Sequence, residues 1–149
     1  METEYTIEID APVAAVFDWF EDPEKVKRWV SNLLVHEVTC QTEDKTGAAV
    51  HQEYQGSGRI VGLDGRILIY EPSRRLAVNL AGRSFDVTAD HHFHDLDGRT
   101  RLTQFGKLRL RGVMKIVAFF VQGAVKKAAL DELDKNFRRL KRLCETEAQ

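Results

Sequence analysis

Hydrophobic and polar positions alternate along most of the first 110 residues, with one interruption near the amino terminus. Residues Thr3 to Ile9 are rich in β-branched and aromatic types and predict a strand. After this strand, Asp10 is placed to cap a helix that has Pro12 in its first turn, and apolar residues follow at helical spacing. The pair Asp22-Pro23 breaks that helix and begins another, which we expect to run from Pro23 to about Val30. The pattern therefore predicts two short helices directly after the first strand.

Six further strands are predicted before residue 111, with turn signals such as Asp97-Gly98 between them. Gly62 and Gly65 lie inside one of these strands and indicate a bulge or a sharp bend. The connections are short, and parallel neighbours would need long crossovers, so we expect a seven-stranded antiparallel sheet. The expected ranges are Leu34–Gln41, Ala48–Gln55, Arg59–Glu71, Arg75–Ala81, Ser84–Leu96 and Thr100–Leu110.

The remaining pattern, from Val113 to about Cys144, predicts a single helix, about 48 Å long at 1.5 Å per residue. Its second half is amphipathic, and we expect it to cover the apolar face of the sheet. Its first half, Met114–Val125, is apolar on most sides, so some of these residues must meet a second surface. The two short helices, a homodimer partner and a membrane all remain open as that surface. Gly123 could allow a kink within this half.

Length and composition narrow the function classes. A chain of 149 residues predicts one domain, residues 1–149. The 22 basic and 23 acidic residues give a net charge of −1, which argues against nucleic-acid binding through bulk positive charge. No apolar run reaches the roughly 20 residues that a bilayer requires, and no signal peptide precedes the first strand, so we expect a cytoplasmic protein without stable membrane insertion. Two cysteines do not make a disulfide framework.

Four local motifs occur in the same order as in a known superfamily. They are Ile9-Asp10-Ala11-Pro12 with Val16-Phe17, Trp19, Asp22-Pro23-Glu24 and Trp29; Tyr70-Glu71-Pro72 with Arg75-Leu76; Gly98-Arg99-Thr100-Arg101-Leu102-Thr103; and Leu140-Lys141 with Glu145. Over nearly the whole chain the sequence resembles the START-like superfamily, also called SRPBCC, and its polyketide cyclase/dehydrase-like branch. The resemblance implies an α+β helix-grip fold, in which a long carboxy-terminal helix covers a hydrophobic cavity on a curved sheet.

The resemblance also implies a range of functions. Members of this superfamily bind lipids, sterols, polyketides or ubiquinone-like molecules, some act as cyclases or aromatases, and many only carry or sense a ligand. No catalytic motif is shared, and no cofactor is implied. Fold alone does not fix function.

Strand alternation selects the side chains that face such a cavity. The polar members of the inner set are His36, Gln52, Tyr54, His91 and Gln104. The apolar candidates are Val78, Phe93 and Leu108 from the strands and Phe120 from the helix. These polar groups either orient a ligand or hydrogen-bond one another in a solid core. A bulge would reverse the alternation beyond it.

The catalytic candidates are few. His91 is the one candidate general base, since imidazole titrates near neutral pH. His92 and His94 share the opposite face with Asp90, but the spacing dictates no third ligand, so we predict no metal site. The first hypothesis is therefore binding or transport of a hydrophobic small molecule. A cyclase or dehydratase that uses His91, Tyr54 and Gln104 is the second, and a protein-interaction module that uses the apolar half of the long helix is the third.

Overall fold

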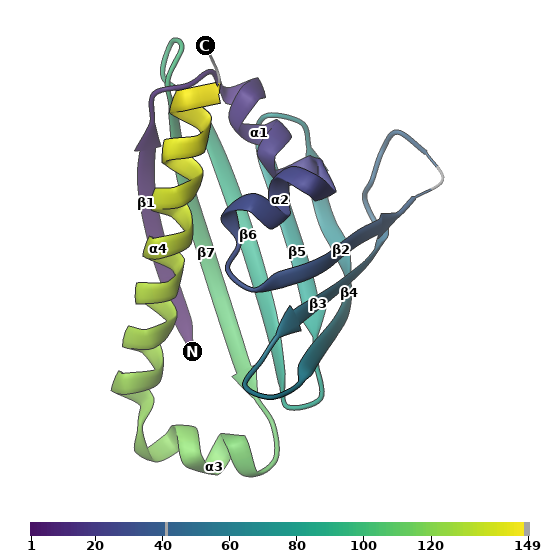
Figure 1. The fold of residues 1–149 in the computed structure, drawn as a ribbon, viewed down its shortest axis with the longest axis vertical. Helices are drawn as coiled ribbons and strands as arrows, with labels where there is room; N and C mark the ends of the chain where they lie inside the picture. The colour runs from purple at the N-terminus through teal and green to yellow at the C-terminus, as the bar shows by residue number, and fades with distance from the viewer. Residues whose placement is uncertain (41, 148–149) are drawn as a thin grey trace.

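The computed structural model describes residues 1–40 and 42–147. Its strands form one antiparallel sheet in the order β1-β7-β6-β5-β4-β3-β2. Figure 1 shows α4 lying along the sheet on one face, α1 and α2 beside its carboxy-terminal end, and α3 at the opposite end of the molecule. The predicted helix-grip architecture is confirmed. The elements are β1 (Glu2–Ile9), α1 (Val13–Glu21), α2 (Pro23–Trp29), β2 (Leu33–Thr39), β3 (Ala49–Gln55), β4 (Ile60–Glu71), β5 (Arg75–Ala81), β6 (Phe85–Asp95), β7 (Thr100–Leu110), α3 (Val113–Phe120) and α4 (Gln122–Glu147).

The two short helices begin in different ways. Asp22 caps α2, because its carboxylate accepts a hydrogen bond of 2.9 Å from the Glu24 backbone N–H. The predicted cap of α1 by Asp10 is wrong: Pro12 is the N-cap residue, and no side chain among the described residues caps this end. The helical spacing of apolar residues in α1 places Phe17 and Phe20 in the core. Together the two helices close one end of the sheet.

Turn chemistry fixes the last hairpin, and bulges modify two strands. Asp97 and Gly98 both have positive φ, as a type I′ turn requires. The bulge expected near Gly62 and Gly65 is instead at Leu68, where the β4–β5 register shifts. Gly65 serves close approach, because a Cβ there would lie 1.7 Å from the Asn79 carbonyl oxygen. Alternation along β2 predicts that Leu34 points inward with His36, but a second register shift leaves Leu34 exposed and buries Leu33 instead. Gln41, the expected end of this strand, lies outside the described residues.

The prediction of one continuous helix from Val113 to Cys144 is also wrong. Helix α3 ends at Phe120, Val121 adopts φ −127° and ψ 31°, and α4 begins at Gln122. Val121 is β-branched and Gly123 follows closely, and both are weaker helix formers than Ala or Leu. The break turns α3 away from the axis of α4, so that it lies across the end of the sheet (Figure 1).

The core lies between the inner face of the sheet and the helices. Several side chains there are fully buried, including Ile9, Val16, Leu102, Phe137 and Leu140. Buried polar groups are paired: the Trp29 indole donates to the Trp19 carbonyl at 2.9 Å, and the Thr100 hydroxyl donates to the Ala11 carbonyl at 2.8 Å. Among the described residues, no helix combines the length and the apolar character needed to span a bilayer.

Candidate functional site

A cavity of about 250 Å³ lies between the inner face of the sheet and helices α2 and α4. Its walls are mostly apolar, and polar side chains enter it from two separate parts of the sheet. This combination is typical of a small-molecule site. The apolar walls include Val38, Val50, Ile67, Leu76, Val78, Leu80, Val87 and Ala89 from the strands and Phe20, Val26, Trp29, Leu133 and Phe137 from the helices.

The first polar group belongs to β2 and β3 and forms a chain of hydrogen bonds. The Tyr54 hydroxyl donates to Gln52 Oε1 at 2.7 Å, and Gln52 Nε2 donates to His36 Nδ1 at 2.9 Å. Burial raises the pKa of Tyr54 to about 12, and burial together with Lys27 lowers the pKa of His36. The chain is therefore uncharged at neutral pH, with the His36 proton on Nε2.

The second polar group is the pair His91 and Gln104, on β6 and β7. His91 Nδ1 donates to the Leu76 carbonyl at 3.1 Å, and Nε2 lies 2.7 Å from Gln104 Oε1. Burial lowers the pKa of His91 to about 4, so the ring is neutral at pH 7. A neutral imidazole carries one proton, so a ring that donates at Nδ1 accepts at Nε2. The Gln104 amide must then donate, with its NH₂ group turned toward Nε2 of His91.

The apolar middle of the sheet separates the two polar groups. Strands β4 and β5 lie between β3 and β6 and contribute Ile67, Leu76, Val78 and Leu80 to the cavity. A ligand that filled the space would therefore meet a hydrogen-bonding group near each end and an apolar surface between them.

A charged pair marks a further part of the wall. The Tyr70 hydroxyl donates to Glu21, and Lys45 Nζ lies 3.5 Å from the same carboxylate. Burial, followed by the hydrogen bond to Glu21, raises the pKa of Tyr70 to about 12. The side chains of Glu21 and Lys45 are 28% and 29% exposed, so this part of the wall faces solvent.

Of the nine predicted site residues, the structure brings six to this cavity: His36, Gln52, Tyr54, Val78, His91 and Gln104. The other three lie elsewhere. Phe93 packs in the core, its ring centroid 5.1 Å from those of Phe17 and Phe20. Leu108 lines a different hollow, and Phe120 is 78% exposed because α3 turns away at Val121.

Sequence reasoning missed Tyr70, Glu21 and Lys45. Strict alternation puts Tyr70 on the face opposite Ile67, but the bulge at Leu68 returns it to the inner face. Glu21 ends α1, and Lys45 lies in the loop before β3, so neither belongs to a strand whose alternation could be counted. Of the three, only Tyr70 could have been found from the sequence, because it begins the turn motif Tyr70-Glu71-Pro72.

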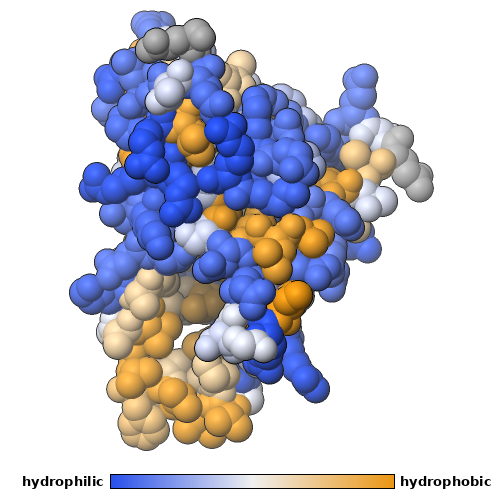
Figure 2. Space-filling model, in the orientation of Figure 1, coloured by the Kyte–Doolittle hydropathy of each residue, from blue (hydrophilic) through white to orange (hydrophobic). Residues whose placement is uncertain are grey.

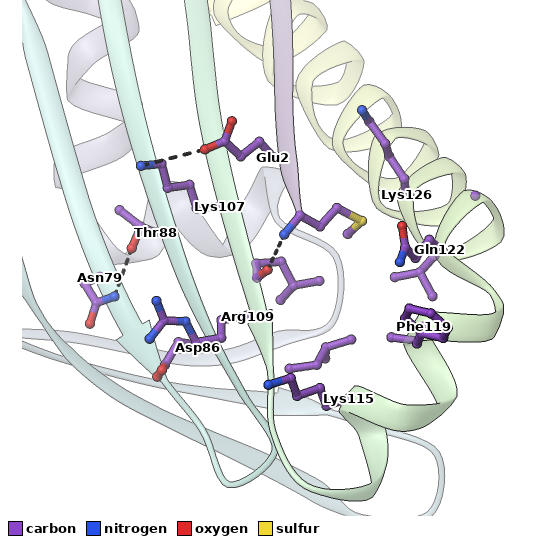
Figure 3. Close-up of a pocket in the computed structure, with 16 residues that line it drawn as sticks. Glu2, Asn79, Asp86, Thr88, Lys107, Arg109, Lys115, Phe119, Gln122 and Lys126 are labelled. Carbon is purple, nitrogen blue, oxygen red and sulfur yellow. Dashed lines mark hydrogen bonds and ion pairs between the residues drawn. The ribbon is translucent and has the colours of Figure 1, made fainter.

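A second hollow of about 940 Å³ lies at the other end of the molecule, between β7, α3 and the start of α4. Figure 3 shows Lys115, Phe119, Gln122 and Lys126 on the helical side and Arg109 on the side of the sheet. Neighbouring residues of β7 from opposite faces of the sheet line it, so it opens around the sheet edge. The smaller cavity, with its buried and hydrogen-bonded polar groups, is the better candidate for a ligand site.

The remaining candidate groups are engaged elsewhere. Asp90 accepts two hydrogen bonds from Arg75, at 2.8 and 3.0 Å, and lies 3.3 Å from His92. Over residues 1–40 and 42–147, no three His, Cys, Asp or Glu side chains are placed to hold a metal ion. Burial raises the pKa of Cys144 to about 12, which makes this thiol a poor nucleophile at neutral pH.

Comparison with known proteins identifies the family. Residues 1–145 match the model of the family described as polyketide cyclase / dehydrase and lipid transport. The chain belongs to this family. A search of curated proteins finds no match.

Solved structures share the helix-grip fold of this family at low sequence identity. A protein from Thermus thermophilus is 14% identical with a TM-score of 0.80, and all of both chains is covered. A START superfamily protein from Mycobacterium smegmatis is 15% identical with a TM-score of 0.76, over 97% of each chain. The Zhui aromatase/cyclase from Streptomyces sp. R1128 is 15% identical with a TM-score of 0.72, over 95% of this chain and 94% of its own.

Proposed function

We propose that this protein binds a small hydrophobic molecule with two polar ends in the cavity between the sheet and helices α2 and α4. The main support for this proposal is that two separate hydrogen-bonded clusters lie on either side of an apolar wall. They are Tyr54-Gln52-His36 and His91-Gln104. Membership of a family that is described by both cyclisation and lipid transport supports a hydrophobic ligand.

The cavity volume restricts the ligand. Pockets for drug-sized molecules span roughly 300–1,000 Å³, and this one, at about 250 Å³, lies just below that range. We therefore expect a compact ring system or a short acyl chain rather than a lipid with two long chains.

A cyclase or dehydratase activity is the second candidate function. A structural neighbour that is an aromatase/cyclase favours it, as does the polar chain that ends at His36. However, general-base catalysis works best when the pKa of the base is near the working pH. Burial keeps the pKa of His91 at about 4, and both ring nitrogens already have partners, which favours a positioning role for His91.

The first experiment is organic extraction of natively purified protein followed by mass spectrometry. A stoichiometric hydrophobic compound in the extract is the expected result. Thermal shifts across a panel of polyketide-like and acyl compounds then rank ligands. An empty extract together with no thermal shift would contradict the proposal.

A pair of variants localises the ligand. Ala89 lines the cavity, and its neighbour Thr88 points to the other face of β6. Ala89→Leu fills part of the space and should weaken binding at least tenfold, whereas Thr88→Leu should leave the ligand Kd unchanged. To separate the two functions, His91→Ala should lower kcat as well as ligand affinity if the protein is a cyclase, but only weaken binding if it is a carrier.

A further inference from the structure

The short helix α3 is apolar and has no buried residue. Its exposed side chains and the next residue form what we call the tip surface: Val113, Met114, Ile116, Val117, Phe119, Phe120 and Val121, which are between 41% and 78% exposed. Figure 2 shows this apolar surface at the lower end of the molecule, where α3 lies in Figure 1. Contiguous exposed apolar surface of this kind marks an interaction site.

Positive charge is concentrated around the same end. Residues 107–130 contain six Lys or Arg and no Asp or Glu, which leaves a net charge of −7 on the rest of the chain. Three of these bases have acidic partners: Lys107 with Glu2, Arg111 with Asp86, and Lys127 with Asp131. For the other three, Arg109, Lys115 and Lys126, the described residues provide no ion pair, and all three are exposed.

These three bases lie beside the tip surface. Lys115 belongs to α3 itself, Lys126 to the start of α4, and Arg109 to the end of β7. Figure 3 places them around the hollow that α3 borders. The tip is thus an apolar projection with basic residues around its base.

We propose that α3 docks this protein onto the surface of a bilayer that contains anionic lipids. The apolar side chains enter the boundary between headgroups and acyl chains, and the basic residues contact the headgroup phosphates. At eight residues, α3 is about 12 Å long, so it lies in the interface and does not cross the bilayer.

The charge pattern favours lipid over a second copy of the chain. A dimer formed by apposing two tip surfaces would bring two groups of unpaired bases together, and like charges across an interface are unfavourable. An anionic bilayer instead offers negative charge over the whole contact. The inference goes beyond the ligand cavity, since the tip residues and the cavity residues are distinct.

The test is co-sedimentation of the full chain with large unilamellar vesicles of phosphatidylcholine alone or of phosphatidylcholine and phosphatidylglycerol at 7:3. We expect binding to the anionic vesicles that weakens as salt is raised, because screening shortens the reach of surface charge. No binding to either vesicle, or equal binding to both, would overturn the proposal.

Variants assign the binding to the tip. Phe119→Ser with Phe120→Ser should lower the partition coefficient at least tenfold, whereas Leu68→Ser, at an exposed position on β4, should leave it unchanged. Lys115→Gln and Lys126→Gln should each lower it about fivefold at low salt. The matched control is Lys135→Gln, an exposed lysine in the middle of α4. Unchanged binding by the double serine variant would contradict the assignment.

Two further measurements distinguish lipid from a second copy. Phe120→Trp places a reporter on the tip, while Trp19 and Trp29 are buried. Its emission should shift to the blue on addition of anionic vesicles and be quenched by brominated lipid. Light scattering across a concentration series should show a monomer. A dimer that Phe119→Ser with Phe120→Ser dissociates would overturn the proposal and assign the tip to self-association.

Discussion

Helices α3 and α4 follow one another in the chain but meet opposite environments. Helix α3 is almost entirely apolar, yet Phe119 and Phe120 are 70% and 78% exposed. Helix α4 is rich in charged residues, yet it buries Phe137, Leu140 and Cys144 completely. The spacing of apolar residues, rather than their number, therefore decides which helix the sheet can bury. A stripe at three- and four-residue steps fits one flat face, whereas a helix that is apolar all round cannot be covered by one face.

Removal of the buried Phe137 ring from α4 should reduce stability more than any other change described below. Phe137 packs against Tyr5 and Trp29, with ring centroids 5.4 and 5.7 Å away. Phe137→Ala should lower the free energy of unfolding by about 3–5 kcal/mol, because it removes a fully buried ring and leaves a cavity. Urea denaturation followed by circular dichroism measures this loss. A loss below about 1 kcal/mol would mean that α4 does not anchor the core.

The second prediction concerns the pH dependence of stability that arises from His91, whose ring packs against Phe20 and Phe137. The pKa of His91 falls from 6.5 to about 4 on folding, so the unfolded chain binds more protons between these pH values. Stability should therefore fall as pH drops from 6.5 to 4, with a contribution from His91 of about 3 kcal/mol. Urea midpoints across this range measure it.

The matched variants for this pH effect lie on one strand. His91→Gln removes the titrating ring, so the free energy of unfolding should fall less between pH 6.5 and pH 4 in this variant than in the wild type. The matched control is His94→Gln, at an exposed position on β6. Parallel profiles for wild-type and His91→Gln would show that burial of His91 does not control the pH response.

The third prediction tests the hydrogen bond that links α4 to β1, between Asp134 and Tyr5. The Tyr5 hydroxyl donates to Asp134, which also accepts from Arg138 Nε at 2.9 Å. Tyr5→Phe removes the hydroxyl and keeps the ring against Phe137, so it should cost about 0.5–1.5 kcal/mol of stability. Asp134→Asn with Tyr5→Phe in a double-mutant cycle measures the coupling between the two side chains. Strict additivity would show that they do not interact.

Removal of the exposed Phe120 ring from α3 should change stability least. Phe120→Ala removes the same ring as Phe137→Ala, but from a position that is 78% exposed. It should change the free energy of unfolding by no more than about 0.5 kcal/mol. The same denaturation assay measures it. A loss near that of Phe137→Ala would mean that α3 is covered in solution.

The candidate site shows where strand alternation succeeds as a predictor and where it stops. Counting by twos placed Gln52, Tyr54, His91 and Gln104 on the inner face, because β3, β6 and β7 carry no bulge between these positions. It failed for Tyr70 beyond the bulge at Leu68. A bulge adds one residue to a strand and leaves little trace in the local sequence.

The sequence alone could not predict which polar residues in the cavity hydrogen-bond to each other. Alternation puts His36 and Gln52 on one face, but only the β2–β3 register places them opposite each other. The same holds for His91 and Gln104 across β6 and β7. The register depends on turn geometry and on where each strand shifts, so these pairs appear only in the folded sheet.

Local sequence was enough to predict the order of the elements, the antiparallel sheet, the Asp97-Gly98 turn and the amphipathic stripe of α4. Each of these depends on local periodicity or on the backbone preferences of single residues. The folded chain alone reveals the break at Val121, the exposure of α3, the inward position of Tyr70 and the pairing of polar groups in the cavity. In the folded chain, different apolar surfaces compete for burial against the sheet. The outcome depends on the whole fold, so a local sequence pattern cannot predict it.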